Sequence, residues 1–173
     1  MRALTFLVAV LLTGELFAAT LDGRVVGVHY GDTITVLDAS RKQYKIRLAG
    51  IDAPEFKQAF GSRSKQNLSR LVFGHDVRIE WQKRDRYRRI LGKVWTISSD
   101  APCQASSCPK TLDANLAQIT DGMAWHYKHY ERDQSPEDRE RYAFAEREAR
   151  AKKAGLWADP SPVPPWEWRR EKR

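Results

Sequence analysis

The sequence contains only two cysteines in 173 residues, too few for the disulfide frameworks that stabilise small secreted domains. Acidic residues are also scarce relative to basic ones. There are 22 Asp and Glu against 30 Lys and Arg, so the formal net charge is +8. Hydrophobic residues make up 42% of the chain, which excludes disorder throughout and allows one domain with a packed core. The basic excess predicts an anionic partner such as nucleic acid.

Long apolar runs are missing as well, and a membrane-spanning helix needs about 20 such residues. The apolar run at residues 3–12 follows Met1-Arg2 and leads to the small residues Ala18-Ala19. This order is typical of a secretory signal peptide, so we predict that residues 1–19 are removed. The mature protein is then expected to be secreted or periplasmic, without stable membrane association. An uncleaved anchor and a first core strand are the alternatives for this segment.

The positive charge is concentrated in one third of the chain. Residues 41–93 contain 15 Lys and Arg against 5 Asp and Glu, a local net charge of +10. A uniformly basic surface is a common solubility feature, whereas a localised excess is more typical of a binding footprint.

Apolar and polar residues alternate in several short segments, which predicts strands with one buried face. Three longer segments carry helix signals, and the clearest is the Ser135 N-cap followed by Pro136. The pattern predicts an α+β, mainly β fold, an OB-fold five-stranded barrel with about three helices. The predicted strands cover residues 25–28, 33–37, 44–48, 77–81 and 91–97, and the helices cover 57–73, 113–121 and 135–155. Residues 159–173 form a tail rich in Pro, Trp and charge.

Three segments bring together the side chains that phosphodiester hydrolysis needs: residues 31–33, 46–55 and 85–92. Guanidinium groups stabilise the charge that develops on phosphate oxygens, because they are always charged and donate two parallel hydrogen bonds. A hard cation such as Ca²⁺ prefers carboxylate and carbonyl oxygens, and a further carboxylate can orient or deprotonate water. The candidate residues are Asp32, Arg47, Asp52, Glu55 and Arg89.

In this order and spacing, the three segments resemble the staphylococcal (micrococcal) nuclease family, also called thermonuclease-like. The resemblance covers residues 21–158 and extends to Asn115-Leu116 and Gly155-Leu156-Trp157. It implies an OB-fold nuclease domain at residues 20–158. It also implies calcium-dependent hydrolysis of DNA and RNA with low sequence specificity, leaving 3′-phosphate ends.

The resemblance also implies individual roles. Asp32 and Asp52 are expected to bind Ca²⁺ through their carboxylates, and Ala53 through its backbone carbonyl. Glu55 is expected to position or activate water. The implied phosphate-binding arginines are Arg47 and Arg89, and the implied nucleotide contacts are Arg86, Tyr87 and Tyr130.

Two residues depart from the family pattern. Tyr30 stands where the best-known member has an aspartate, which removes one acidic contribution near the metal. Arg88 replaces a common glycine, and we therefore expect a backbone that does not need a positive φ there. The two cysteines, Cys103 and Cys108, are expected to form a small-loop disulfide, because a zinc site lacks two further ligands.

The leading hypothesis is an exported, monomeric, calcium-dependent nuclease that prefers single strands, since a basic OB-fold face holds a flexible backbone more easily than a duplex. The rival hypothesis is a non-catalytic OB-fold module that binds nucleic acid. A third is a membrane-surface protein that uses the basic segment electrostatically.

Overall fold

The computed structural model describes residues 19–98, 100–101 and 108–172. Residues 1–18 of the predicted signal peptide lie outside this range, as does Cys103, so the signal peptide and the disulfide stay predictions. Within the described residues, no helix has the length and apolar character needed to cross a membrane.

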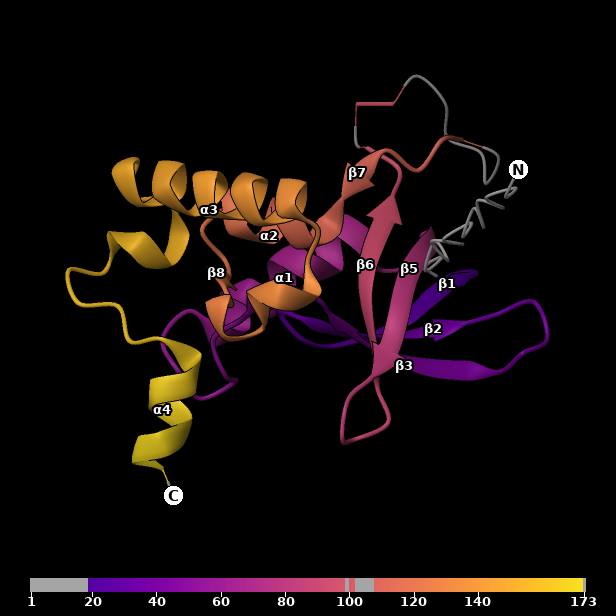
Figure 1. The fold of residues 1–173 in the computed structure, drawn as a ribbon, viewed down its shortest axis with the longest axis horizontal. Coiled ribbons are helices and arrows are strands. Elements are labelled where there is room, and N and C mark those ends of the chain that lie inside the picture. The colour runs from indigo at the N-terminus through magenta and orange to yellow at the C-terminus, as the bar shows by residue number, and fades with distance from the viewer. Residues whose placement is uncertain (1–18, 99, 102–107, 173) are drawn as a thin grey trace, which may run out of the picture.

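Five strands close into a barrel, which confirms the predicted OB-fold (Figure 1). Their order is β3-β2-β1-β5-β6, and all these neighbours are antiparallel. A parallel pairing of β3 with β6, Ile46 opposite Ile90, closes the ring and makes the sheet mixed. The strands are β1 (Ala19–Tyr30), β2 (Thr33–Leu37), β3 (Gln43–Leu48), β5 (Asp76–Arg84) and β6 (Ile90–Thr96).

The barrel is filled by the alternating apolar positions of its strands. Each such side chain contributes about 1.5–3 kcal/mol when it leaves water completely. Helix α1 (Gly61–Val72) packs Leu68 and Val72 into the same core. The inward-facing barrel residues are all at most 1% exposed: Val25, Ile34, Val36, Ile46, Leu48, Val77, Ile79, Ile90 and Val94.

Helix α1 begins four residues later than predicted, because residues 57–60 form a turn. The Gln58 N–H donates to the Glu55 carbonyl, and Phe60 at the N-cap has a φ of 66°. Gly61 follows because a Cβ there would overlap the Glu55 carbonyl oxygen. The turn therefore holds the start of α1 against the segment that carries Glu55.

The sequence pattern missed three two-residue strands, which are too short to show a period. The pair β4 (Ile51–Asp52) and β8 (Trp125–His126) is antiparallel, with Asp52 opposite Trp125. Strand β7 (Leu112–Asp113) extends the barrel sheet beside β6 and leads into α2 (Ala114–Thr120). The β4–β8 pair matters for the site because it fixes the backbone of Asp52.

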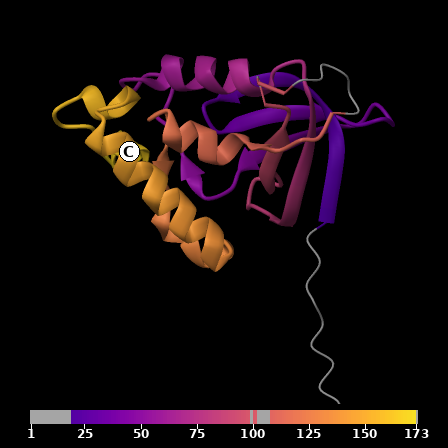
Figure 2. The same ribbon diagram turned by 90° about the horizontal axis from the view of Figure 1, so that it is seen from above.

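The remaining helices lie on the side of the barrel away from β1 and β2 (Figures 1 and 2). Helix α3 (Pro136–Ala151) starts as predicted, with Ser135 Oγ accepting from the Asp138 N–H at 3.1 Å. It ends before Gly155, which begins a separate 3₁₀ turn, η2 (Gly155–Ala158). Another 3₁₀ segment, η1 (Lys128–Asp133), precedes α3, and the tail contains a helix that the sequence did not predict, α4 (Pro165–Glu171).

Candidate active site

Asp32 lies in the turn between β1 and β2, where hydrogen bonds tie it to two other segments. Its Oδ1 accepts from Thr33 Oγ1 at 2.8 Å, and its Oδ2 accepts from the Ala53 N–H at 2.9 Å. Its backbone carbonyl accepts from the Leu48 N–H at 2.8 Å, at the end of β3. These contacts bury the Asp32 carboxylate against the segment that follows β4.

Arg47 bridges Asp32 and Asp52 from β3. Its Nη2 donates to Asp52 Oδ1 at 2.9 Å and lies 3.2 Å from Asp32 Oδ2. Its Nη1 donates to the carbonyl oxygens of Leu48 and Ile51, at 2.9 and 2.8 Å. Only 13% of the Arg47 side chain is exposed. One mostly buried guanidinium therefore holds two buried carboxylates close to each other.

Asp52 is the most deeply buried acid of the group, with a side chain only 1% exposed. Burial raises its pKa above the ordinary value, and the negative charge of Asp32 adds to this rise. The nearby cations Arg47 and Arg169 act in the opposite direction. The ionised form of Asp52 therefore depends on the positive charges around it.

Glu55 follows Asp52 in an irregular turn and is more accessible, with 34% of its side chain exposed. The Glu55 N–H donates to Gln58 Oε1 at 3.1 Å, which orients this turn. Both acids contact Arg169 of α4, whose Nη1 donates to Glu55 Oε1 and whose Nη2 donates to Asp52 Oδ2, each at 2.8 Å. The two carboxylates therefore face a common space.

Arg89 lies in the hairpin between β5 and β6, where Asp85 holds it. Its Nε donates to Asp85 Oδ2 at 2.7 Å, and Asp85 Oδ1 accepts from the N–H groups of Tyr87 and Arg89. Partial burial raises the pKa of Asp85, but these hydrogen bonds outweigh that effect and keep the pKa below its usual value. Among the described residues, the Nη atoms of Arg89 make no hydrogen bond, so its outer edge is available to a ligand.

The barrel places Arg47 in β3 and Arg89 directly before the adjoining strand β6. Ile46 pairs with Ile90, and both point into the core. Since side chains alternate along a strand, Arg47 after Ile46 and Arg89 before Ile90 both lie on the outer face. Arg86 and Tyr87 occupy the tip of the same hairpin, where the Arg86 guanidinium lies 4.9 Å from the exposed Tyr87 ring.

The expectation for the Arg88 backbone was wrong. Arg88 has a φ of 64°, the left-handed conformation that favours glycine. The hairpin turn requires it, because the Arg88 N–H donates to the Asp85 carbonyl at 2.9 Å and the next N–H must reach the Asp85 side chain. The arginine keeps the geometry of a glycine turn at a cost in conformational energy.

Tyr130 lies in η1, and half of the residue is exposed. It packs edge to face on Tyr127, with ring centroids 5.3 Å apart. Tyr127 is the tyrosine beside the site. Its partial burial and the charge of Asp52 raise its pKa, and its N–H donates to the Gly50 carbonyl. No sequence motif singles out Tyr127, although it follows directly after β8.

The structure thus brings Asp32, Arg47, Asp52 and Ala53 together and joins Glu55 to them through Arg169. It places Arg86, Tyr87 and Arg89 on the neighbouring hairpin and Tyr130 against the ring of Tyr127. Arg169 was also missed. It lies in the tail, 114 residues after Glu55, and no sequence pattern connects it with the acids.

The oxygen atoms of the site decide which metal ions it suits. Within the described residues, no group of three His, Cys, Asp or Glu side chains is placed to hold a metal ion. The available donors are the carboxylates of Asp32 and Asp52, both within 3.2 Å of Arg47 Nη2, and backbone carbonyls. An all-oxygen donor set fits Ca²⁺ or Mg²⁺, which complete their coordination with water or phosphate oxygens. It does not suit zinc, which favours nitrogen and sulfur.

Comparison with known proteins supports the same interpretation. Residues 45–159 match the family described as "Staphylococcal nuclease homologue". The chain is 42% identical over 153 residues to a "Micrococcal nuclease" of Shigella flexneri, covering 88% of this chain and 82% of that protein. It is 40% identical over 172 residues to an "Uncharacterized endonuclease" of Escherichia coli, covering 99% and 100%. It is 42% identical over 163 residues to "Protein ParB" of Escherichia coli, covering 94% and 87%.

Proposed function

We propose that this chain, which belongs to the staphylococcal nuclease family, is an exported, calcium-dependent endonuclease of DNA and RNA. We propose further that it cleaves with little sequence specificity and leaves 3′-phosphate ends. The observation that carries the proposal is the cluster of Asp32, Arg47 and Asp52, in which one guanidinium joins two buried carboxylates. Glu55, three residues after Asp52, adds a more accessible carboxylate at the edge of this cluster.

The two arginines are proposed to hold the scissile phosphate. Arg47 lies in β3, and Arg89 directly precedes the adjoining strand β6, with both on the outer face of the barrel. Asp85 fixes the Nε edge of Arg89, so the two Nη groups form a fork whose direction is set before substrate binds. Such preorganised donors stabilise the charge that develops on phosphate oxygens in the transition state.

Asp32, Asp52 and the Ala53 carbonyl are the groups proposed to hold Ca²⁺. The bound cation supplies positive charge that polarises the phosphate and offsets its negative charge. Glu55 is proposed to take the proton of the attacking water, since its carboxylate is partly open to solvent and lies beside the buried acid. Arg86, Tyr87 and Tyr130 are proposed to contact neighbouring nucleotides, through charge and through exposed rings.

Single-strand preference, a monomeric state and export are further parts of the proposal. The hairpin tip combines a cation and an exposed aromatic ring, a pairing typical of single-strand binding. Export rests on the composition of residues 1–19. The N-terminal sequence of the protein recovered from culture medium or periplasm tests it. Intact Met1 in the recovered protein would contradict it.

The cleavage experiment uses the purified protein and end-labelled single-stranded DNA, duplex DNA and RNA, with Ca²⁺ or with a calcium chelator. We expect cleavage only with Ca²⁺, faster on single strands, and loss of cleavage in Asp52→Asn. Binding without cleavage in Ca²⁺ would support the alternative, a non-catalytic nucleic-acid-binding module.

A further inference from the structure

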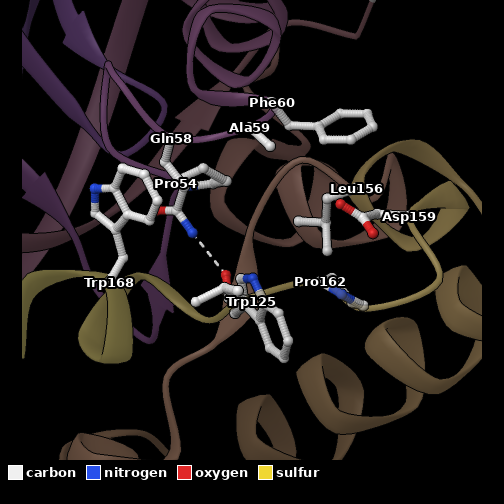
Figure 3. Close-up of a pocket in the computed structure, with 10 residues that line it drawn as sticks. Pro54, Gln58, Ala59, Phe60, Trp125, Leu156, Asp159, Pro162 and Trp168 are labelled. Atoms are coloured by element: carbon white, nitrogen blue, oxygen red, sulfur yellow. Dashed lines mark hydrogen bonds between the residues drawn. The ribbon is translucent and has the colours of Figure 1, made fainter. Parts of the chain in front are cut away.

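The C-terminal tail folds back onto the candidate site. Trp166 of α4 stacks on Tyr127, with ring centroids 5.5 Å apart and planes inclined by 22°, and meets Trp125 edge to face. Trp168 lines a small cavity together with Pro54 and Gln58 (Figure 3). The dashed line in Figure 3 marks the 2.6 Å hydrogen bond from Gln58 Nε2 to the Val163 carbonyl. The tail is therefore anchored beside the acids.

The anchored tail places the Arg169 guanidinium in contact with Asp52 and Glu55. Its Nη2 donates to Asp52 Oδ2 at 2.8 Å, and its Nη1 donates to Glu55 Oε1 at 2.8 Å and to Asp52 Oδ1 at 3.3 Å. Asp52 Oδ1 also accepts from Arg47. Both oxygens of Asp52 are thus already occupied by arginine donors.

A divalent cation and Arg169 compete for these oxygens. The Asp52 side chain is 1% exposed, and while Arg169 is bound each of its oxygens already accepts from an arginine. Two cations held within a few ångströms of each other in a partly buried site also repel strongly. Without Arg169, Asp32 and Asp52 keep Arg47 as their ion-pair partner among the described residues, and a divalent cation would balance the excess negative charge of the three acids.

Arg169 can also move away from Asp52 and Glu55. Its side chain is 39% exposed, and α4 has only seven residues. A helix this short is unstable without its tertiary contacts, so losing one set of contacts can release it. The cavity beside Trp168, about 70 Å³, is far smaller than a nucleotide site, so it serves the docking of the tail.

We propose that Arg169 is an internal competitor of the divalent cation, and that α4 or its Arg169 side chain must move away from Asp52 and Glu55 before the cation binds. This inference rests on the proposed function, because it assumes that Asp52 is a cation ligand. The tail then sets the calcium concentration at which the enzyme becomes active.

The experiment compares calcium binding by the full chain, Arg169→Gln and Arg170→Gln. Arg170 is the matched control, because it is the next residue of α4, carries the same charge and is 74% exposed. Isothermal titration with Ca²⁺, or luminescence of Tb³⁺, gives the dissociation constant without any cleavage. We expect Arg169→Gln to bind about tenfold more tightly, as the loss of a charge-assisted competitor of modest strength implies. Arg169→Lys keeps the charge without the fork and is expected to lie in between.

A second readout follows the tail itself. Hydrogen exchange at residues 165–171 of the wild-type protein is expected to speed up when Ca²⁺ is added. Equal calcium affinity in Arg169→Gln and Arg170→Gln, or weaker binding in Arg169→Gln with an unchanged melting temperature, would overturn the inference. If the wild type and these variants still cleave DNA with Ca²⁺, the proposed function survives the failure of this inference. If none of them binds Ca²⁺ or cleaves DNA, the inference and the proposed function both fail.

Discussion

Removal of the Arg47 charge tests how the site is held together. Arg47→Met keeps most of the side-chain length but removes both Nη groups. Two carboxylates that are 1% and 8% exposed then lose their shared partner, and the Leu48 and Ile51 carbonyls lose a donor. Removing one partner of a buried ion pair costs about 3 kcal/mol or more. For a chain of this size, that corresponds to a fall in melting temperature of about 10 °C.

The loss of stability in Arg47→Met should depend on pH, and the direction of this dependence follows from the pKa of Asp52. Burial raises the pKa of Asp52 above 3.8, and removing Arg47 removes a charge that opposes this rise. A carboxyl group whose pKa is raised in the folded state stabilises the folded protein when it is protonated. This stabilisation is complete below pH 3.8 and is lost as the pH rises through the folded-state pKa. The stability gap between wild type and Arg47→Met should therefore narrow as the pH falls from 7 toward 4.

The assay is urea unfolding at several pH values, with Arg78→Met as the control. Arg78 is also a strand arginine in an ion pair, with Asp22, but both side chains are more than half exposed. Its loss is expected to have little effect, as for most surface pairs. Equal stability loss in the two variants, or a gap for Arg47→Met that does not change with pH, would refute the reasoning.

Three further predictions concern neighbouring residues. Arg89→Met should lower the rate of cleavage about 100-fold, as for the loss of one transition-state donor; Arg84→Met on the same hairpin is the control, and equal rates in the two variants would contradict the role. Arg88→Gly should stabilise the protein by about 0.5 kcal/mol in urea unfolding, because it relieves the left-handed backbone; a destabilised variant would argue against strain there. Asn115→Ala should cost about 3 kcal/mol, since the buried amide makes three backbone hydrogen bonds that join β6 to the segment after β3; a change below 1 kcal/mol would contradict it.

Much of the barrel could be predicted because each strand repeats an apolar residue every second position. The closure could not be predicted in this way, since the parallel pairing of Ile46 with Ile90 joins segments 44 residues apart. The two-residue strands β4 and β8 span a single period, so their alternation cannot repeat. The start of α1 was misplaced because Phe60 adopts a left-handed conformation that the apolar pattern does not reveal.

In the site, too, some residues could be predicted from sequence motifs and others could not. Asp32, Arg47 and Asp52 stand in short motifs, and the structure places them in contact. Arg169 stands in no motif, and only the docking of Trp166 and Trp168 brings it to Asp52. The positive φ of Arg88 was missed because a non-glycine residue is a poor indicator of that conformation. It is the hydrogen bonds to Asp85 that impose it.

The most direct test of the account is the calcium-dependent cleavage rate of Glu55→Gln beside that of the wild-type protein on one single-stranded oligonucleotide. Glutamine keeps the size of the side chain and cannot take a proton from water. We predict a rate at least about 100-fold lower with calcium still bound, which corresponds to the loss of a general base. Equal rates in the two proteins, or wild-type cleavage that continues when calcium is chelated, would contradict it.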